Sequence, residues 1–395
     1  MTQYSTTEAP FSAPPSVGRT QRRRPRRWIA LLVVLVVLVP TVDSYFGALT
    51  AKGTDSLGIR TTEWLRVHHF RWLVNDVEHF YYTHHQPKRG GAPSGQLATQ
   101  LQGGGHRFKP DQTASLSLPL PAPIQPFVAN PPPGEGTWQP LVQVKGQPAI
   151  MAAYLRPDAV HTSLVSGVAW INPKLVRSVG YAGTQEPGGT WTNQVPIPDS
   201  ARSNLVAAFN SGFKMSDALG GYYADGRFAR PMRAGAATAW IDTAGALHVG
   251  QWGRDVSQTP NVTFARQNLS LLVDGGQPVP DSVTGVSSKW GVTVGNKVLV
   301  WRSGLGERAD GSIVYAAGSG LSVGTLAQIL SRAGAVRAME LDINSAWTTF
   351  FTYGPAQAGD PATALTVNRL VADMQPSTQN YLTASSRDFF ALFRR

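Results

Sequence analysis

The sequence contains no cysteine. Disulfide bridges, thiolate catalysis and cysteine-ligated metal sites are therefore excluded, and any folded part of the chain must rely on its hydrophobic core. Charged residues make up only 15% of the 395 residues, whereas glycine and proline are abundant. This composition indicates long loops or linkers, so we expect one domain of catalytic size with attachments.

Several familiar catalytic motifs are also missing. The chain has no G-x-x-x-x-G-K-[ST] phosphate loop, no H-E-x-x-H motif and no G-x-S-x-G nucleophile elbow. Five of the eight histidines lie close together: His68, His69, His79, His84 and His85. None of them are spaced as H-x-x-x-H, and no acidic ligands are regularly interleaved. We therefore expect neither a metal site nor a cofactor.

The formal net charge of +11 is concentrated at the N-terminus. Residues 1–27 hold six arginines against Glu8 alone, and the remaining basic residues are scattered. The run Trp28–Val39 is apolar throughout, and the window Trp28–Leu49 has 22 residues, the length that crosses a bilayer. Because arginines stay on the inner side, we expect a basic cytoplasmic tail (1–27), a single-pass signal anchor (28–49) and an extracytoplasmic remainder that binds no nucleic acid.

A cleavable secretory signal is the rival interpretation of the same segment. Twelve apolar residues are also the length of a signal-peptide core. The sequence around Gly47–Ala51 has no clean small-x-small cleavage site, and the basic region is long. The anchor is therefore the preferred interpretation, and cleavage stays open.

Two attachments precede the folded domain. Residues 61–84 predict one amphipathic juxtamembrane helix, because apolar side chains recur on one helical stripe: Val67, Phe70, Val74, Val77 and Tyr81. This helix would lie near the bilayer or pack on the domain. Residues 86–136 are rich in glycine and proline and predict a disordered linker that holds the domain away from the membrane.

Residues 137–395 predict an α+β domain with a mixed, largely antiparallel sheet core and few covering helices. Alternating apolar segments separated by turn signals indicate the strands: 141–144, 150–155, 165–171, 205–209, 237–241, 269–273, 290–294 and 297–301. The clearest helix covers 322–333, and a short second helix is predicted near 362–374.

One segment near the C-terminus places two carboxylates together. Ser322 can cap the predicted helix, and Gly334 can end it in a left-handed conformation. From Val336 the apolar period becomes two, so Glu340 and Asp342 share one strand face. Their Cα atoms would lie about 6.6 Å apart, a separation at which two carboxyl groups can flank one substrate bond.

Four motifs, in order, resemble the phosphodiester glycosidase family over roughly residues 138–353. They are Asn210-Ser211-Gly212-Phe213, Arg230-Pro231-Met232-Arg233-Ala234-Gly235, Leu271-Leu272-Val273-Asp274-Gly275-Gly276, and Gly320-Leu321-Ser322 followed by Glu340-Leu341-Asp342-Ile343-Asn344-Ser345. The chain departs from the family where Ile343-Asn344-Ser345 replaces a glycine run. Such runs allow close backbone approach or positive φ, which a β-branched residue adopts only at a cost.

The resemblance implies a site made from these motifs. It implies Asp342 as the catalytic carboxylate and Arg233 as the phosphate ligand, with Arg230 as its substitute, while Glu340 is a catalytic candidate on geometry. Glu340 is alternatively a buried, ion-paired carboxylate, against Arg337 or Arg302. The expected substrate-binding residues are Asn210, Ser211, Asp274, Asn344 and Ser345, and both Asn210 and Asp274 are alternatively ordinary turn residues.

The sequence therefore predicts a membrane-anchored, extracytoplasmic hydrolase. The resemblance implies that it cleaves the bond between a sugar and a phosphate in a glycosyl phosphodiester, in glycans of the cell envelope. The altered Asp342-Ile343-Asn344 motif keeps a second hypothesis open, a catalytically inactive surface module that binds glycans or anionic polymers.

Overall fold

The computed structural model describes residues 26–51, 55–102, 116–284, 288–290, 299–355, 365–375 and 381–395. The chain forms two compact units, Met1–Ala51 and Lys52–Arg395. The first unit contains helix α1 (Arg26–Thr50), which includes Pro40. Within the described ranges, no helix combines the length and the apolar character needed to cross a membrane.

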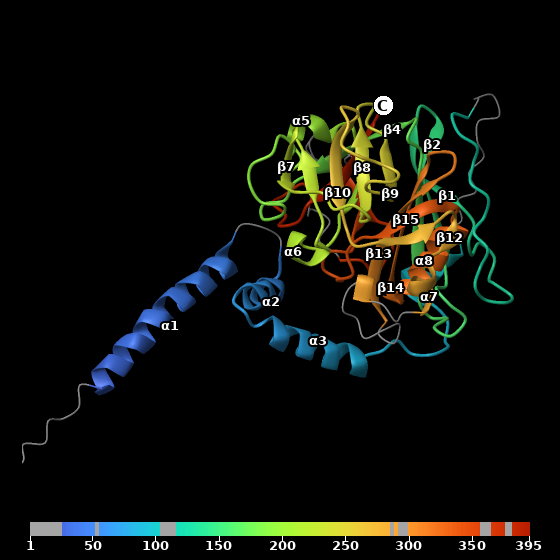
Figure 1. The fold of residues 1–395 in the computed structure, drawn as a ribbon. Coiled ribbons are helices and arrows are strands. Elements are labelled where there is room, and N and C mark those ends of the chain that lie inside the picture. Colours follow the sequence, from blue (N-terminus) through green and yellow to red (C-terminus); the bar gives the residue numbers. More distant parts are fainter. Residues whose placement is uncertain are drawn as a thin grey trace, which may run out of the picture. The chain divides into compact units, whose positions relative to one another are not determined.

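Three antiparallel sheets build the second unit (Figure 1). In spatial order, the eight-stranded sheet contains β1 (Gln139–Val144), β2 (Gln147–Leu155), β3 (Ser166–Ile171), β14 (Ile313–Leu321), β13 (Val300–Arg308), β15 (Ala335–Glu340), β11 (Leu271–Asp274) and β12 (Gln277–Pro278). One five-stranded sheet contains β7 (Arg227–Arg230), β6 (Tyr222–Ala224), β10 (Val262–Gln267), β8 (Ala237–Asp242) and β9 (Leu247–Gln251). The other contains β17 (Leu365–Arg369), β16 (Phe350–Pro355), β5 (Leu205–Asn210), β18 (Phe389–Arg394) and β4 (Val176–Tyr181).

Helices are few and short in this unit. They are α2 (Leu57–Val67), α3 (Arg71–His84), α4 (Gly95–Leu101), α5 (Asp199–Arg202), α6 (Met215–Ala218), α7 (Pro280–Thr284), the 3-10 turn Ser288–Trp290 and α8 (Val323–Arg332). Ser322 caps α8 by accepting a hydrogen bond from the Thr325 N–H, and Gly334 follows with a φ of 91°. Both features were predicted from the sequence. Mostly antiparallel sheets with few helices confirm the predicted fold class of the domain.

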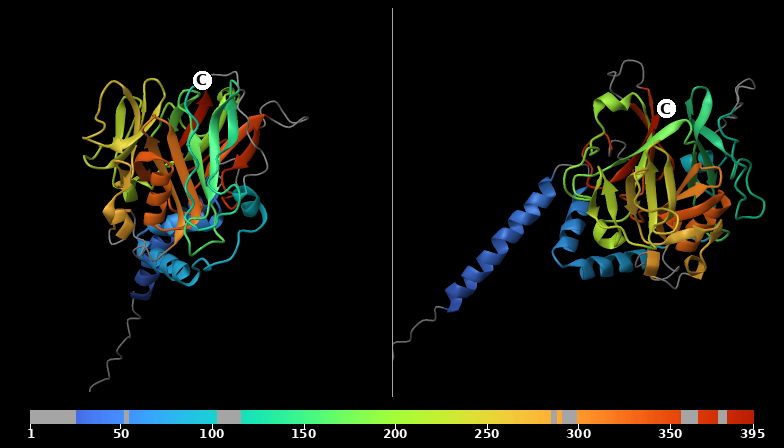
Figure 2. Two further views of the ribbon diagram at one scale, coloured as in Figure 1. Left: turned by 90° about the vertical axis from the view of Figure 1, so that its right-hand side faces the viewer. Right: turned by 45° about the horizontal axis from the view of Figure 1, so that its top comes forward.

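The large sheet is apolar on both faces. Met339 and Leu341 belong to the core shared with the two smaller sheets. Ala338 and Ala335 belong to a second core beneath α8, which covers the opposite face (Figures 1 and 2). Polar groups placed between these layers are therefore removed from water and need partners inside the protein.

Residues 61–84 do not form the single helix that the periodicity predicted. Two helices, α2 and α3, are separated at His69, which adopts a φ of 69°. Of the predicted apolar stripe only Val74 is buried. A left-handed residue cannot lie inside a continuous right-handed helix, so the stripe does not continue across the break.

The linker prediction for residues 86–136 also needs correction. Helix α4 buries Leu101, and the extended segment after residue 115 buries Leu118 and Ile124. Glu135 is buried in an ion pair with Arg156, whose Nη2 lies 2.8 Å from Oε2. The described parts of this segment, 86–102 and 116–136, contain no strand, yet isolated apolar side chains along them still pack on the domain.

The helix predicted near 362–374 is also wrong where the structure describes it. Residues Leu365–Arg369 form strand β17, paired with β16 from Phe351 opposite Arg369 to Pro355 opposite Leu365. Tertiary pairing overrode a weak local preference. Residues 291–294 and 297–298 of the two remaining predicted strands fall outside the described residues, Trp290 ends the 3-10 turn, and strand β13 begins at Val300.

Candidate functional site

Strand β15 ends in an irregular step. Gly304 of β13 lies opposite Glu340. Beyond this pair, the Ser303 N–H donates to the Asp342 carbonyl at 3.0 Å, while the Leu341 N–H donates to the Ser303 carbonyl at 2.8 Å. Two residues of one strand thus face one residue of the other, the pattern of a β-bulge, which re-aims side chains. The alternation that placed Glu340 and Asp342 on one face is interrupted between them.

Asp342 is a buried carboxylate with cations nearby. It is 4% exposed, and its Oδ1 accepts a hydrogen bond from the Asn344 N–H at 2.9 Å. Burial raises the pKa of Asp342 above its ordinary value of 3.8, and the positive charges of Arg387 and Arg66 act against this rise. A carboxyl group shielded from bulk water and poised by neighbouring charges is suited to act as a base or nucleophile.

Glu340 adopts the ion-paired alternative. Its Oε1 lies 2.5 Å from Nη1 of Arg302, and both side chains are fully buried. Burial raises the pKa of Glu340 to about 7, and Arg302 opposes that rise. Its second oxygen, Oε2, is buried without a hydrogen-bond partner among the described residues. The fully buried pair holds the end of β15 against β13 and offers no open side to a substrate.

The side chain of Asn210 is fully engaged with the protein. Its Oδ1 accepts hydrogen bonds from the Tyr315 hydroxyl at 2.9 Å and the Thr349 N–H at 3.1 Å. Its Nδ2 donates to the Ser211 carbonyl at 2.8 Å and to Ser303 Oγ at 3.0 Å. An asparagine amide has two donor and two acceptor positions, so none remains for a sugar. Asn210 instead joins β5, β13 and β14 behind the bulge.

Unpartnered polar atoms gather in the segments around Asp342. Ser211 Oγ, Trp347 Nε1 and Arg387 Nη1 are buried and have no hydrogen-bond partner among the described residues. The Arg387 guanidinium carbon lies 4.9 Å from the centre of the Trp347 ring. Buried donors are normally paired, so these atoms mark a place where a polar ligand would be accommodated. Ser211, which the sequence predicted as a binding residue, is one of these residues.

A lysine completes the set of charges. Lys214 directly follows the Asn210–Phe213 motif and precedes α6. Burial and the positive charge of Arg387 lower the pKa of Lys214 to about 8, while Asp217 and Asp342 act against this fall. Lys214 forms an ion pair with Glu63 of α2. The site therefore holds two close cations beside one buried carboxylate.

The loop after Asp342 positions that carboxylate. Asn344 donates its backbone N–H to Asp342, and its own Oδ1 accepts from the Ala346 N–H at 2.9 Å. Ser345 is half-buried in the same turn. Ile343 has no positive φ. The loop thus forms without the conformation that a glycine run would permit, so Ile343 carries no backbone strain here.

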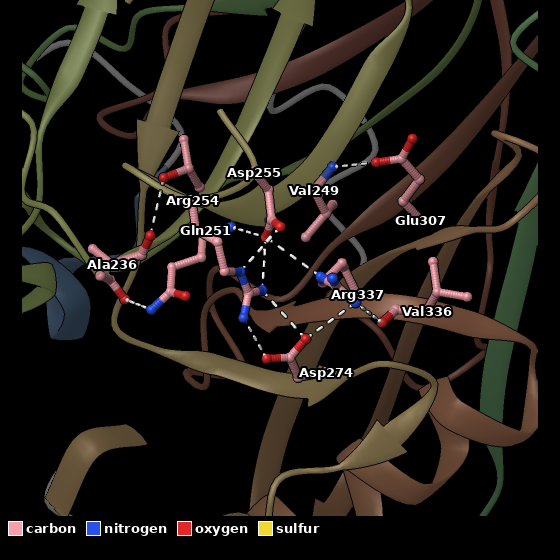
Figure 3. Close-up of polar contacts among 11 residues, drawn as sticks. Ala236, Val249, Gln251, Arg254, Asp255, Asp274, Glu307, Val336 and Arg337 are labelled. Atoms are coloured by element: carbon pink, nitrogen blue, oxygen red, sulfur yellow. Dashed lines mark hydrogen bonds and ion pairs between the residues drawn. The ribbon is translucent and has the colours of Figure 1, made fainter. Parts of the chain in front are cut away.

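Asp274 lies in a separate surface network. Its carboxylate pairs with Arg254 at 2.7 Å and with Arg337 at 3.1 Å, and Asp255 joins the same arginines (Figure 3). Asp274 faces Arg337 in the β11–β15 register, five residues from Asp342 along the chain. At about 3.3 Å per residue this is about 16 Å. The structure does not bring Asp274 to the site.

The two arginines of the second motif donate to backbone carbonyls of α6 and of the residue that ends it. The Arg233 guanidinium donates to the Leu219 carbonyl at 2.6 Å, and the Arg230 guanidinium donates to the Met215 carbonyl. Neither forms an ion pair with Asp342 in the part of the chain that the structure describes. Gln267 is hydrogen-bonded to the backbone of Arg233, and its neighbour Asn268 donates to the Glu340 and Leu341 carbonyls.

An open pocket of about 560 Å³ lies at another place in the domain. Its lining includes Trp191, Tyr222, Asp225 and Asp242, and none of the predicted site residues. Within the described residues, no three histidine or carboxylate side chains gather as metal ligands would.

Sequence reasoning missed four residues of the site: Lys214, Asn268, Trp347 and Arg387. Lys214 had a local signal, because it directly follows a matched motif. Arg387 had none, since it lies near the C-terminus and reaches the site only because β18 pairs with β5, with Phe389 opposite Asn210.

Comparison with known proteins agrees with the motifs. The profile of the phosphodiester glycosidase family matches residues 203–372. The catalytic domain of zebrafish N-acetylglucosamine-1-phosphodiester alpha-N-acetylglucosaminidase, auto-inhibited by its pro-peptide, is 14% identical, with a TM-score of 0.39 over 66% of this chain and 88% of that one. A hypothetical protein from Synechocystis is 14% identical, with a TM-score of 0.33 over 65% of this chain and 64% of that one. No curated protein matches this chain.

Segments that carry Asn210, Arg233, Asp274 and Asp342 all fall within the matched range, and β5, β13 and β15 bring its first and last motifs together. Residues 203–372 of this chain therefore form a phosphodiester glycosidase domain. Proteins of this family are glycosidases that act on phosphodiester bonds.

Proposed function

We propose that this protein hydrolyses the bond between the anomeric carbon of a sugar and a phosphate oxygen in a glycosyl phosphodiester. One observation carries the proposal. Within the family-matched range, the buried carboxylate of Asp342 lies among unpartnered donors and close to two cations. This combination suits a neutral sugar joined to an anionic leaving group.

Asp342 is the proposed catalytic carboxylate. In the reaction, the C1–O bond to phosphate breaks, its electron pair leaves with the phosphate, and a hydroxyl group from water is added to C1. Asp342 either accepts the proton of that water or attacks C1 first. A phosphomonoester leaves as a stable anion, so the reaction needs little acid catalysis.

Other residues of the site have supporting roles. Glu340 and Arg302 fix the strand end, and Asn210 and Asn344 hold the two segments that carry Ser211 and Asp342. We therefore assign Asn210, Asn344 and Glu340 as positioning residues. Ser211 Oγ and Trp347 Nε1 are the groups that we propose to contact the sugar.

The test compares the parent protein with Asp342→Asn and Asp274→Asn on a panel of chromogenic and N-acetylglucosamine phosphodiesters. Both variants remove one negative charge from the family-matched range, but only Asp342 lies in the site. We expect Asp342→Asn to lose 10²-fold or more of its turnover, about the contribution of a general base. Equal turnover in parent and Asp342→Asn would remove Asp342 from the reaction.

A noncatalytic glycan-binding module is the second candidate. It is favoured by Ile343-Asn344-Ser345, which stands where the family has a glycine run. Saturable binding of the phosphodiester panel without turnover, in a parent protein with an intact fold, would support the module and reject the hydrolase.

We further propose that residues 28–49 hold the protein at a membrane, with the basic tail cytoplasmic and the enzyme domain facing the cell envelope. The sequence supports this through its arginines, and apolar side chains of α1, from Leu32 to Phe46, are exposed. Retention of the protein in the membrane pellet after carbonate washing, and its release when leucines and valines of 31–39 are replaced by serine, would be the expected result.

A further inference from the structure

Helix α2 contributes a carboxylate to the centre of the site. Glu63 forms an ion pair with Lys214, and its Oε1 lies 4.0 Å from Nη2 of Arg387. All three side chains are largely buried, with 19%, 14% and 11% of their surfaces exposed for Glu63, Lys214 and Arg387. Lys214 directly precedes α6, so its ion pair with Glu63 joins α2 to the start of that helix. Glu63 therefore belongs to the site's charge balance although it lies outside the family-matched range.

Lys214 and Arg387 form a pair of like charges that needs an anion. Each is largely buried, and the charge of Arg387 lowers the pKa of Lys214. Two cations held together away from water are stable only if a negative group lies between them. Asp342 supplies part of this charge, and the charges of Asp55 and Asp217 also act on Lys214. Glu63 forms an ion pair with Lys214.

One N–H group of Arg387 has no acceptor among the described residues. Its Nη2 faces Glu63, while its Nη1 is buried without a hydrogen-bond partner among the described residues. The guanidinium lies over the Trp347 ring, so its orientation is fixed. A carboxylate has two oxygens, whereas a phosphodiester offers two non-bridging oxygens that share one negative charge and two ester oxygens. The larger anion would satisfy the remaining donor that Glu63 leaves unpaired.

We propose that Lys214 and Arg387 form the phosphate subsite of this protein, and that Glu63 occupies it in this structure so that α2 competes with anionic substrate. This inference rests on the proposed function, since it assigns the phosphate of the same substrate. It places the phosphate beside Asp342, where the anomeric carbon would come next to the carboxylate. In this proposal Lys214 and Arg387 take the role of phosphate ligand that the family resemblance implied for Arg233, whose guanidinium donates to the Leu219 carbonyl.

Competition by α2 requires that the helix can leave. The helix ends at Val67 and is followed by the left-handed residue His69, which separates it from α3. Arg66 of α2 is bound by Glu78 of α3 at 2.7 Å, so the two helices are joined and would move together. No residue of α2 is fully buried, which keeps the cost of its release low.

The experiment measures binding of inorganic phosphate to the full-length protein in mild detergent by titration calorimetry. The variants are Glu63→Gln, which removes the competing charge, and Glu63→Asp, which keeps it. The matched control is Asp76→Asn, an exposed carboxylate of α3 outside the site. Lys214→Met and Arg387→Gln are each added to Glu63→Gln, with near-ultraviolet circular dichroism as the check on folding. Acetate is titrated in parallel to compare a carboxylate with phosphate.

We expect Glu63→Gln to bind phosphate about tenfold more tightly than the parent, within the usual range of coupling between competing groups. Glu63→Asp and Asp76→Asn should bind like the parent, and Lys214→Met or Arg387→Gln should remove the gain. Phosphate should bind Glu63→Gln more tightly than acetate does. Equal affinity in parent and Glu63→Gln would overturn the inference, as would a gain in phosphate affinity that survives Lys214→Met or Arg387→Gln.

Turnover of the phosphodiester panel is measured on the same samples, so the two proposals fail separately. If Glu63→Gln gains phosphate affinity but no variant turns over any phosphodiester, the anion subsite stands and the hydrolase proposal falls. If the protein turns over substrate and Glu63→Gln changes neither turnover nor phosphate affinity, the hydrolase stands and the role of Glu63 falls.

Discussion

Replacement of Asn210 by alanine distinguishes two roles for this residue, substrate binding and stabilisation of the fold. The motif resemblance implies that the Asn210 amide binds substrate. In the structure, the amide instead makes four hydrogen bonds inside the protein and is 4% exposed. The first role predicts a weaker affinity for substrate, and the second predicts a less stable protein.

The expected loss of stability follows from these four bonds. A buried hydrogen bond contributes about 1 kcal/mol on balance, so the four together contribute about 4 kcal/mol. The groups left behind are themselves buried, since Tyr315 and Ser303 have no exposed surface. Water entering the small space would recover part of this. We therefore expect Asn210→Ala to lower the free energy of unfolding by about 3 to 4 kcal/mol.

Urea unfolding followed by far-ultraviolet circular dichroism measures this loss. Asn368→Ala is the matched control, because Asn368 lies on β17 with an exposed side chain, and its replacement should change stability by less than about 0.5 kcal/mol. An Asn210→Ala protein as stable as the parent, with a raised KM and unchanged kcat, would refute the structural role and restore substrate binding.

Three further predictions follow from the site and its surroundings. Gly212→Ala should lower the free energy of unfolding by about 2 kcal/mol, because its Cβ would lie 2.7 Å from the Asn268 side chain, which supports β15. Gly226→Ala is the control: it would be strained by its positive φ alone and should leave turnover unchanged. Asp274→Asn should leave kcat/KM within about threefold of the parent and cost at most about 1 kcal/mol, since its ion pairs are exposed; a tenfold fall in kcat/KM would return Asp274 to the site. The pKa of Glu340 is about 7 in the folded protein against an ordinary 4.5, so the folded state binds more protons between these values and stability should fall as the pH rises through that window. At about 1.4 kcal/mol per pH unit the fall is about 3.5 kcal/mol. Urea midpoints from pH 4.5 to 7.5 that decline equally in Glu340→Gln would contradict this assignment.

Much of the fold was predictable from local pattern. The α8 boundary followed from Ser322, the apolar spacing and Gly334, because capping and helical period act within a few residues. Strands such as β3 and β5 followed from short apolar runs between turn signals. The break at His69 and the strand at Leu365–Arg369 were not predictable in this way, since a left-handed residue and a pairing with β16 leave no periodic signal.

The candidate site was predictable only in part. Asp342 and Ser211 came from motif order, and the structure gives both an environment that suits a ligand. Hydrogen bonds and an ion pair inside the protein occupy the polar groups of Glu340 and Asn210. Asp274 and Arg233 belong to matched motifs, yet Asp274 pairs with Arg254 and Arg337, and the Arg233 guanidinium donates to the Leu219 carbonyl.

The sequence by itself determined the family resemblance, the antiparallel α+β class and the carboxylate at the end of β15, because each depends on residue order over short distances. Only the tertiary structure decided which charges meet. Lys214, Arg387 and Glu63 are far apart in the chain. They come together because β18 pairs with β5 and because Glu63 of α2 forms ion pairs with both cations. Such contacts depend on the path of the whole chain, whereas motifs and periodicity record only its immediate neighbours.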